Sequence, residues 1–188
     1  MINFFLKMKH WQFFVLTILF EFLIMSMMIV SNSFNITIIF FPIMMVLFMG
    51  ALLGWMYSIS IKFNQLLPEG VKMNVGFYKI CVYFPILYIF VLLLLTSNFV
   101  QKQLVVNSNF PFNLMLIRIC HLFTTFCMFY DLYFTSKTLK TVELKRKIGF
   151  SDYAGEFFLM WFFPIGIWFL QPKINKIYAD YFDKKVEI

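Results

Sequence analysis

Four ionisable side chains stand inside long apolar runs of this chain: Glu21, Arg118, His121 and Asp131. A charge in the hydrocarbon of a membrane is costly, so such a residue usually faces protein or water and often carries function. Glu21 lies near the middle of its run, and its side chain is too short to reach the headgroups. We therefore expect Glu21 to be protonated or to pair with Arg118 or His121.

Arg118 and His121 are one helical turn apart, whereas Asp131 lies about 220° around the same helix at 100° per residue. One interpretation is a proton or ion path, or a catalytic site, lined by Arg118, His121 and Glu21. The other interpretation is structural: Arg118 extends to the outer headgroups, Asp131 lies near a basic patch, and His121 bonds a neighbouring helix.

The sequence contains no Gly-rich phosphate loop, no HExxH and no nucleophile elbow. His121 is the only histidine within an apolar run, which excludes a two-histidine haem site within one chain. The three cysteines, Cys81, Cys120 and Cys127, also fall in apolar runs and are expected to pack as small hydrophobic residues. We expect no cofactor, no metal and no catalytic residue, so the sequence favours a protein that is not an enzyme.

The composition predicts a membrane protein. Hydrophobic residues make up 62% of the 188 residues and charged residues only 13%, whereas a soluble domain has about 25% charged residues. The net charge of +7 comes from lysines that flank apolar runs. In that position they indicate topology and contact with anionic lipid, so the lipid bilayer is the expected partner and nucleic acid is not.

We expect one all-α membrane domain over residues 1–188. Its four transmembrane helices are predicted at about 11–30, 36–59, 80–99 and 113–135. The basic N-terminus, the lysine-containing connection between the second and third helices and the basic run after the fourth would all face the cytoplasm.

The C-terminal apolar segment, 157–170, is predicted to be re-entrant or interfacial. It contains Pro164 and Gly166, and at about 1.5 Å per residue it is shorter than the roughly 30 Å hydrocarbon core. Pro172 is then expected to open an amphipathic helix within a cytoplasmic tail, 171–188.

Gly50, Gly54 and Ser58 recur every four residues along the second predicted span. Small residues at this spacing allow close approach of another helix. We expect this small-residue strip to form the closest helix–helix contact, either within the monomer or in a homo-oligomer.

Two stretches carry a resemblance: LPEGVKMN at Leu67–Asn74, and Asp152–Asn175, which includes WFFPIGIWFLQPKIN. The chain resembles a group of small bacterial multi-span membrane proteins. This resemblance implies the bacterial inner membrane and brings neither an activity nor site residues.

For function, we expect a non-enzymatic membrane subunit, an oligomeric pore or an accessory factor for a cytoplasmic protein partner, with bacterial antiviral defence as one setting. One alternative is a proton-linked small transporter that uses Glu21 and His121. A second alternative is an intramembrane enzyme.

Overall fold

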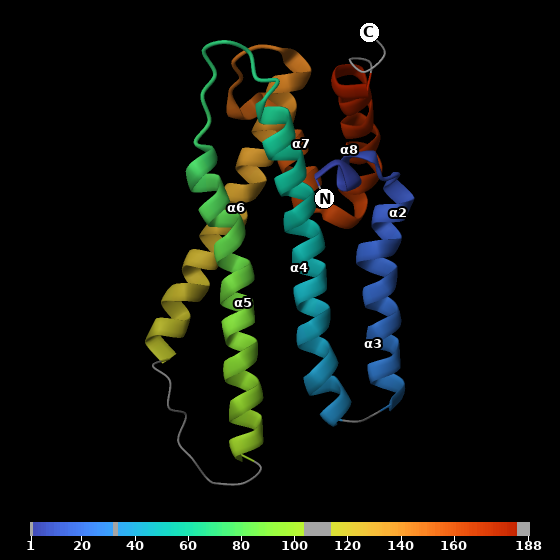
Figure 1. The fold of residues 1–188 in the computed structure, drawn as a ribbon, viewed down its shortest axis with the longest axis vertical. Coiled ribbons are helices and arrows are strands. Elements are labelled where there is room, and N and C mark those ends of the chain that lie inside the picture. Colours follow the sequence, from blue (N-terminus) through green and yellow to red (C-terminus); the bar gives the residue numbers. More distant parts are fainter. Residues whose placement is uncertain (1, 32–33, 104–113, 184–188) are drawn as a thin grey trace.

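The computed structural model describes residues 2–31, 34–103 and 114–183, which form helices and connecting turns without any strand (Figure 1). The all-α prediction is thereby confirmed for these residues. In chain order, the elements are α1 (Ile2–Lys7), α2 (His10–Phe14), the π-helical turn η1 (Val15–Leu19), α3 (Phe20–Ser31), α4 (Phe34–Asn64), α5 (Val75–Gln103), α6 (Leu114–Leu144), α7 (Phe150–Trp161), α8 (Phe163–Tyr178) and the π-helical turn η2 (Ala179–Asp183).

Four stretches of the described chain are long and apolar enough to cross a membrane: His10–Met27, Ile43–Asn64, Val75–Leu94 and Met115–Leu144. α4 is the central helix, with α3 on one side and α5 and α6 on the other (Figure 1). These stretches match the four predicted spans in number and order. α5 begins at Val75 rather than near residue 80, because Asn74 caps it by accepting a hydrogen bond from the Phe77 N–H at 3.0 Å.

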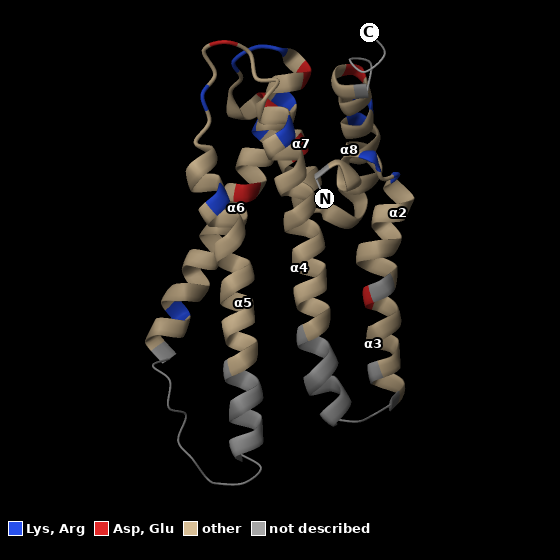
Figure 2. Ribbon diagram, viewed as in Figure 1, with Lys and Arg blue, Asp and Glu red and all other residues tan. Residues whose placement is uncertain are grey.

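Charged residues gather at one end of the bundle, which we call the charged end (Figure 2). α4 and α6 finish there, and α5 begins there (Figure 1). α7 and α8 also lie at this end and pack against each other.

Two amide side chains of α8, Gln171 and Asn175, join this helix to the beginning of the chain, and Asn175 Nδ2 donates to the Met8 carbonyl at 3.0 Å. The helix breaks between α1 and α2, and Gln171 Nε2 donates to the carbonyls of Phe5 and Met8 at this break, both at 2.8 Å. Gln171 Oε1 accepts a hydrogen bond from Trp55 Nε1 of α4 at 2.7 Å. The carbonyls freed by the break therefore have a partner in a buried environment, where an unpaired one would be costly.

α7 and α8 form a hairpin that turns at Phe162, whose φ and ψ are −85° and 52°. Pro164 lies in the first turn of α8, where its missing N–H costs no hydrogen bond. Gly166 then packs on α7 so closely that a Cβ would overlap the Leu159 carbonyl. The apolar segment 157–170 is thus two helices joined by a tight turn.

The prediction that Pro172 opens a separate tail helix is wrong. Pro172 lies inside α8, which continues to Tyr178. The helix continues because Leu170, Ile174 and Tyr178 recur at four-residue spacing and are all buried in the core, so one apolar face extends past the proline.

Gly166 supplies the first test. Gly166→Ala should destabilise the fold by roughly 2–3 kcal/mol, because the added methyl group must displace the backbone of α7. Thermal unfolding in detergent, followed by circular dichroism, would measure this change.

Gly155→Ala in α7 is the matched control, because a Cβ there meets nothing within 4 Å. Alanine favours helix over glycine by about 1 kcal/mol, so this variant should unfold at the same or a higher temperature. Equal midpoints for Gly166→Ala and wild type would contradict the close packing of the hairpin.

Candidate functional site

Asp131 is an ionisable side chain in the interior of the bundle. It lies on α6, which packs against both α4 and α5, and its side chain has no exposed surface. Neither carboxylate oxygen has a hydrogen-bond partner among the described residues. A buried carboxyl without a partner is expensive when ionised, and an unpaired buried polar group calls for an explanation.

Three hydroxyl groups meet one helical turn from Asp131, on the side of the charged end. Thr135 Oγ1 of α6 lies 2.9 Å from Ser60 Oγ of α4 and 3.5 Å from the Tyr78 hydroxyl of α5. Each helix of the α4–α5–α6 interface thus contributes one group to this hydroxyl cluster. All three side chains are buried.

Apolar side chains enclose the cluster. The ring of Tyr78 stacks on Phe134, with centroids 4.2 Å apart and planes at 15°. Leu53 and Val82 belong to the same buried group. This packing fixes the direction of the Tyr78 hydroxyl and separates the site from the surrounding surface.

The titratable groups that face Asp131 are uncharged at neutral pH: Tyr78 and Cys81 on α5, and Cys127 and Tyr130 on α6. They provide no positive charge to balance a carboxylate. Within the described ranges, no group of three or more His, Cys, Asp or Glu side chains is placed to hold a metal ion.

The chemistry available to this arrangement is proton binding. A carboxyl group binds one proton, and a hydroxyl group both donates and accepts a hydrogen bond. Asp131 and the hydroxyl cluster together can therefore hold a proton and pass it to a neighbouring polar group.

Glu21 does not pair with α6. It is partly exposed on α3, which packs against α4 and η1, while α6 lies on the other side of α4 (Figure 1). The structure therefore does not bring Glu21 together with Arg118 or His121. The depth of Glu21 along its helix, on which the expected pairing was based, does not specify which neighbouring helix the side chain faces.

Arg118 and His121 lie on the surface of α6. The imidazole of His121 lies near the ring of Tyr88 on α5, with centroids 6.2 Å apart. Asp131, on another face of α6, is buried. The three ionisable residues of α6 thus have different surroundings, and Asp131 alone among them faces the interior.

The small-residue strip of α4 does not form the closest contact of the fold. Gly50 is exposed, and a Cβ there would meet nothing within 4 Å. Gly54 instead faces the ring of Phe5 in α1, which would lie 3.1 Å from a Cβ added at Gly54, and Ser58 donates to the Gly54 carbonyl at 2.7 Å. Gly166 makes the tighter approach, because a backbone rather than a flexible ring lies opposite it.

A second polar group, the charge cluster, joins α6 to the α7–α8 hairpin. Glu156 of α7 accepts hydrogen bonds from Lys140 of α6 at 3.0 Å and from Lys173 of α8 at 2.8 Å. Glu143 of α6 lies 3.0 Å from each of the same two lysines. Two positive and two negative charges alternate, so the cluster is neutral and internally paired.

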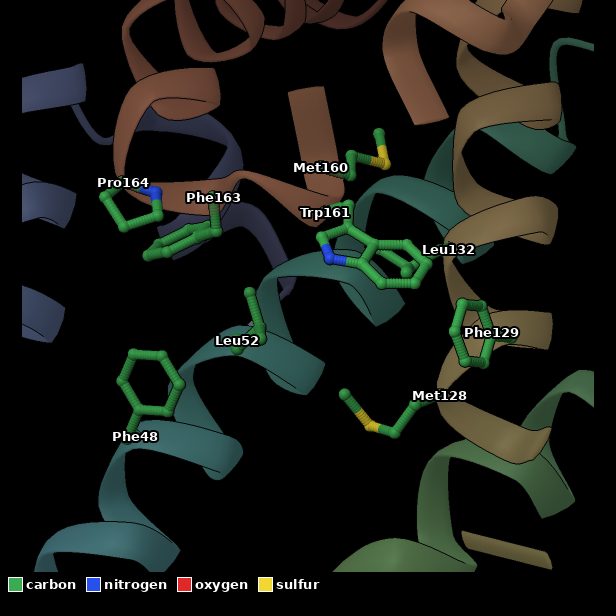
Figure 3. Close-up of a pocket in the computed structure, with 9 residues that line it drawn as sticks. All are labelled: Phe48, Leu52, Met128, Phe129, Leu132, Met160, Trp161, Phe163 and Pro164. Carbon is green, nitrogen blue, oxygen red and sulfur yellow. The ribbon is translucent and has the colours of Figure 1, made fainter. Parts of the chain in front are cut away.

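An apolar cavity of about 350 Å³ lies beside these elements, between α4, α6 and the turn of the hairpin (Figure 3). It is lined by Phe48, Leu52, Met128, Phe129, Leu132, Met160, Trp161, Phe163 and Pro164. This lining has almost no polar group with which to orient a ligand. The cavity therefore offers fewer groups for chemistry than the surroundings of Asp131.

Sequence reasoning named Asp131 but missed Ser60, Tyr78 and Thr135. A signal existed on α6, where Asp131 and Thr135 are four residues apart and so share a face. No comparable signal identified Ser60 or Tyr78, because their part in the cluster depends on how α4 and α5 are rotated.

The chain thus combines an all-helical fold, four helices able to span a membrane and a buried carboxyl beside three hydroxyls. No known protein family, curated protein or solved structure matches it.

The charge cluster predicts a dependence of stability on pH. Burial alone would raise the pKa of Glu156, but hydrogen bonds from Lys173 and Lys140 outweigh it and hold the pKa below the ordinary 4.5. The stabilisation is therefore fully present above pH 4.5 and is lost as the pH falls through the lower pKa of the folded state.

Glu156→Gln should lower stability at neutral pH by about 2 kcal/mol, because two lysines lose a charged acceptor, and should flatten the acid limb of the stability curve. Thermal unfolding in detergent across a pH series would show both effects. Arg146→Gln breaks an exposed pair with Asp152 and should change little. If the stability of Glu156→Gln still fell at acidic pH as steeply as that of wild type, Glu156 would not be the source of the pH dependence.

Proposed function

We propose that this chain is a non-enzymatic polytopic membrane protein that binds and releases a proton at Asp131 as part of a proton-linked cycle. The observation that supports the proposal is the burial of Asp131 with both carboxylate oxygens unpaired at the α4–α5–α6 interface. No other site in the described ranges combines an unpaired buried carboxyl with clustered hydroxyl groups.

Electrostatics links the proton to helix packing. In apolar surroundings an uncompensated carboxylate costs several kcal/mol, whereas the neutral acid costs far less. Loss of the proton therefore favours any rearrangement of α4, α5 and α6 that brings water or a cation to Asp131. Binding of the proton favours the closed packing described above, because a ligand shifts an equilibrium by its differential affinity for the two states.

In this proposal Asp131 takes the role that Glu21 and His121 have in the alternative of a proton-linked transporter. Glu21 and His121 lie on helices separated by α4, so they cannot exchange a proton directly. Asp131 instead has polar neighbours on all three helices of its interface: Ser60, Tyr78 and Thr135.

We further propose that the charged end faces the cytoplasm of a bacterial inner membrane, with the N-terminus on that side. The excess of Lys and Arg at this end supports the orientation, because basic residues are enriched in cytoplasmic connections (Figure 2). In this orientation the α7–α8 hairpin enters the bilayer from the cytoplasmic side and turns back at Phe162.

A second candidate is an accessory factor for a cytoplasmic protein partner. The turn between α6 and α7 supports it, because Lys145, Arg146 and Lys147 are all exposed there. Such a turn would suit an acidic partner surface, or the anionic headgroups of the bilayer. A homo-oligomer would present several copies of this basic turn to the same acidic surface.

Asp131→Asn tests the proposed function. Infrared difference spectra between acidic and alkaline samples contain carboxylic-acid bands from all nine Asp and Glu side chains. One component, the Asp131 band, should be present in wild type and absent in Asp131→Asn, because asparagine cannot bind the proton. Size-exclusion chromatography would verify that the variant is folded.

Glu21→Gln is the control for this experiment, because it removes the other carboxyl of the apolar runs. Its spectrum should keep the Asp131 band. If the difference spectra of wild type and Asp131→Asn contained the same carboxylic-acid components, Asp131 would not be the proton site.

The orientation has its own test. A reporter enzyme that is active only outside the cytoplasm, fused after Ile188, should be inactive, because the hairpin returns the chain to the charged end. Strong reporter activity would show that 157–170 crosses the membrane, and would overturn the proposed re-entrant hairpin.

A further inference from the structure

Polar side chains continue from Asp131 toward the charged end on one face of α6. Thr135 and Thr138 follow Asp131 by four and seven residues, so the three lie within about 60° of one another around the helix. Thr138 is buried, and its hydroxyl lies 3.3 Å from the sulfur of Met73. A polar stripe thus runs along this face of α6.

α4 carries a matching pair of polar residues, Ser60 and Asn64, one turn apart. Ser60 meets Thr135 across the interface, and the side-chain oxygen of Asn64 is buried without a hydrogen-bond partner among the described residues. The hydroxyl of Thr141 on α6 shares this property. Buried polar atoms without a protein partner are normally satisfied by water.

Farther from the charged end, the buried side chains among the described residues of this interface are apolar. Leu53 precedes Ser60 by seven residues on α4, Val82 follows Tyr78 by four on α5, and Cys127 precedes Asp131 by four on α6; all three are buried. Farther along, Thr124 and Tyr88 bond the backbone of α6: Thr124 donates to a carbonyl at 2.8 Å and Tyr88 to another at 3.3 Å. Neither hydroxyl proton is directed at Asp131.

From this asymmetry we infer that Asp131 exchanges its proton through a one-sided hydrated inlet. The inlet opens at the charged end near Asn64, passes Thr138 and the hydroxyl cluster, and ends at Asp131. Toward the opposite end of the bundle, the buried side chains among the described residues of this interface offer no polar group for such a route. Protons therefore reach Asp131 from one side of the membrane.

The transfer conserves protons at each step. The carboxylate makes no direct hydrogen bond to the hydroxyl cluster, so a water molecule bridges the two. This water gives a proton to the Asp131 carboxylate and regains one from the Thr135 hydroxyl. Thr135 in turn takes a proton from a hydronium ion in the inlet, which becomes water, so that one proton leaves the aqueous phase for each one bound.

The inference rests on the proposed function for its purpose, but the inlet can be tested separately. Infrared spectroscopy asks whether Asp131 binds a proton, whereas thiol chemistry asks whether water reaches the hydroxyl cluster. A negative result in one of these two experiments does not affect the interpretation of the other.

The test uses full-length protein in sealed vesicles, with Cys81, Cys120 and Cys127 replaced by alanine. Thr135→Cys is then exposed to a small, charged, membrane-impermeant methanethiosulfonate from each side in turn. Lys147→Cys, on an exposed turn, identifies the side of the charged end. We expect Thr135→Cys to react from the same side as Lys147→Cys and not from the other.

Two further variants define the route. Adding Asn64→Leu, which fills the mouth of the inlet with an apolar side chain, should abolish labelling of Thr135→Cys. Thr124→Cys, on the apolar side of Asp131, should remain unlabelled from the charged end. If Thr135→Cys does not fold, Ser60→Cys serves in its place, because the two hydroxyls are in contact.

Labelling of Thr135→Cys from the opposite side, from both sides or from neither would overturn the one-sided inlet. Unchanged labelling of Thr135→Cys after addition of Asn64→Leu would show that the inlet does not open at Asn64. The expected labelling pattern combined with no titrating Asp131 band would retain the inlet and reject the proposed function.

Discussion

Polar groups inside an apolar bundle have to find partners within the protein, and the arrangement of this chain depends on how that constraint is met. Gln171 shows it most clearly. Its amide joins the carbonyls at the α1–α2 break to the indole of Trp55, so three segments far apart in sequence are held by one side chain. The α7–α8 hairpin is placed by this contact together with the charge cluster, and the hairpin in turn packs on α6.

The charge cluster and the Asp131 site each contain a buried carboxyl group, which is paired with lysines in the cluster and unpaired at Asp131. Glu156 is buried between two lysines, so its charge is compensated where it stands. Asp131 is buried more completely and has no such partner. A paired carboxylate fixes two helices together, whereas an unpaired one makes the packing around it depend on a proton. This contrast is why we assign Glu156 a structural role and Asp131 the functional one.

Much of the fold could be predicted from hydropathy and charge, and much of the site could not. The apolar runs predicted four helices able to span a membrane, and Pro164 with Gly166 indicated that 157–170 is interrupted. The pairing of Glu21 with α6 failed, because depth along a helix does not specify which neighbour it faces. The hydroxyl cluster was missed for the same reason, since Ser60 and Tyr78 join Asp131 only through the rotation of α4 and α5.

The sequence by itself determined the helices, their order and the concentration of charge at one end, because each follows from local hydrophobicity and from residues that flank it. Tertiary structure alone decided which carboxyl group among the described residues is buried without a partner. It also decided that Gly166, rather than Gly54, lies against a neighbouring backbone. Such facts depend on the relative rotation and spacing of helices, which arise from many weak packing contacts summed over the whole bundle.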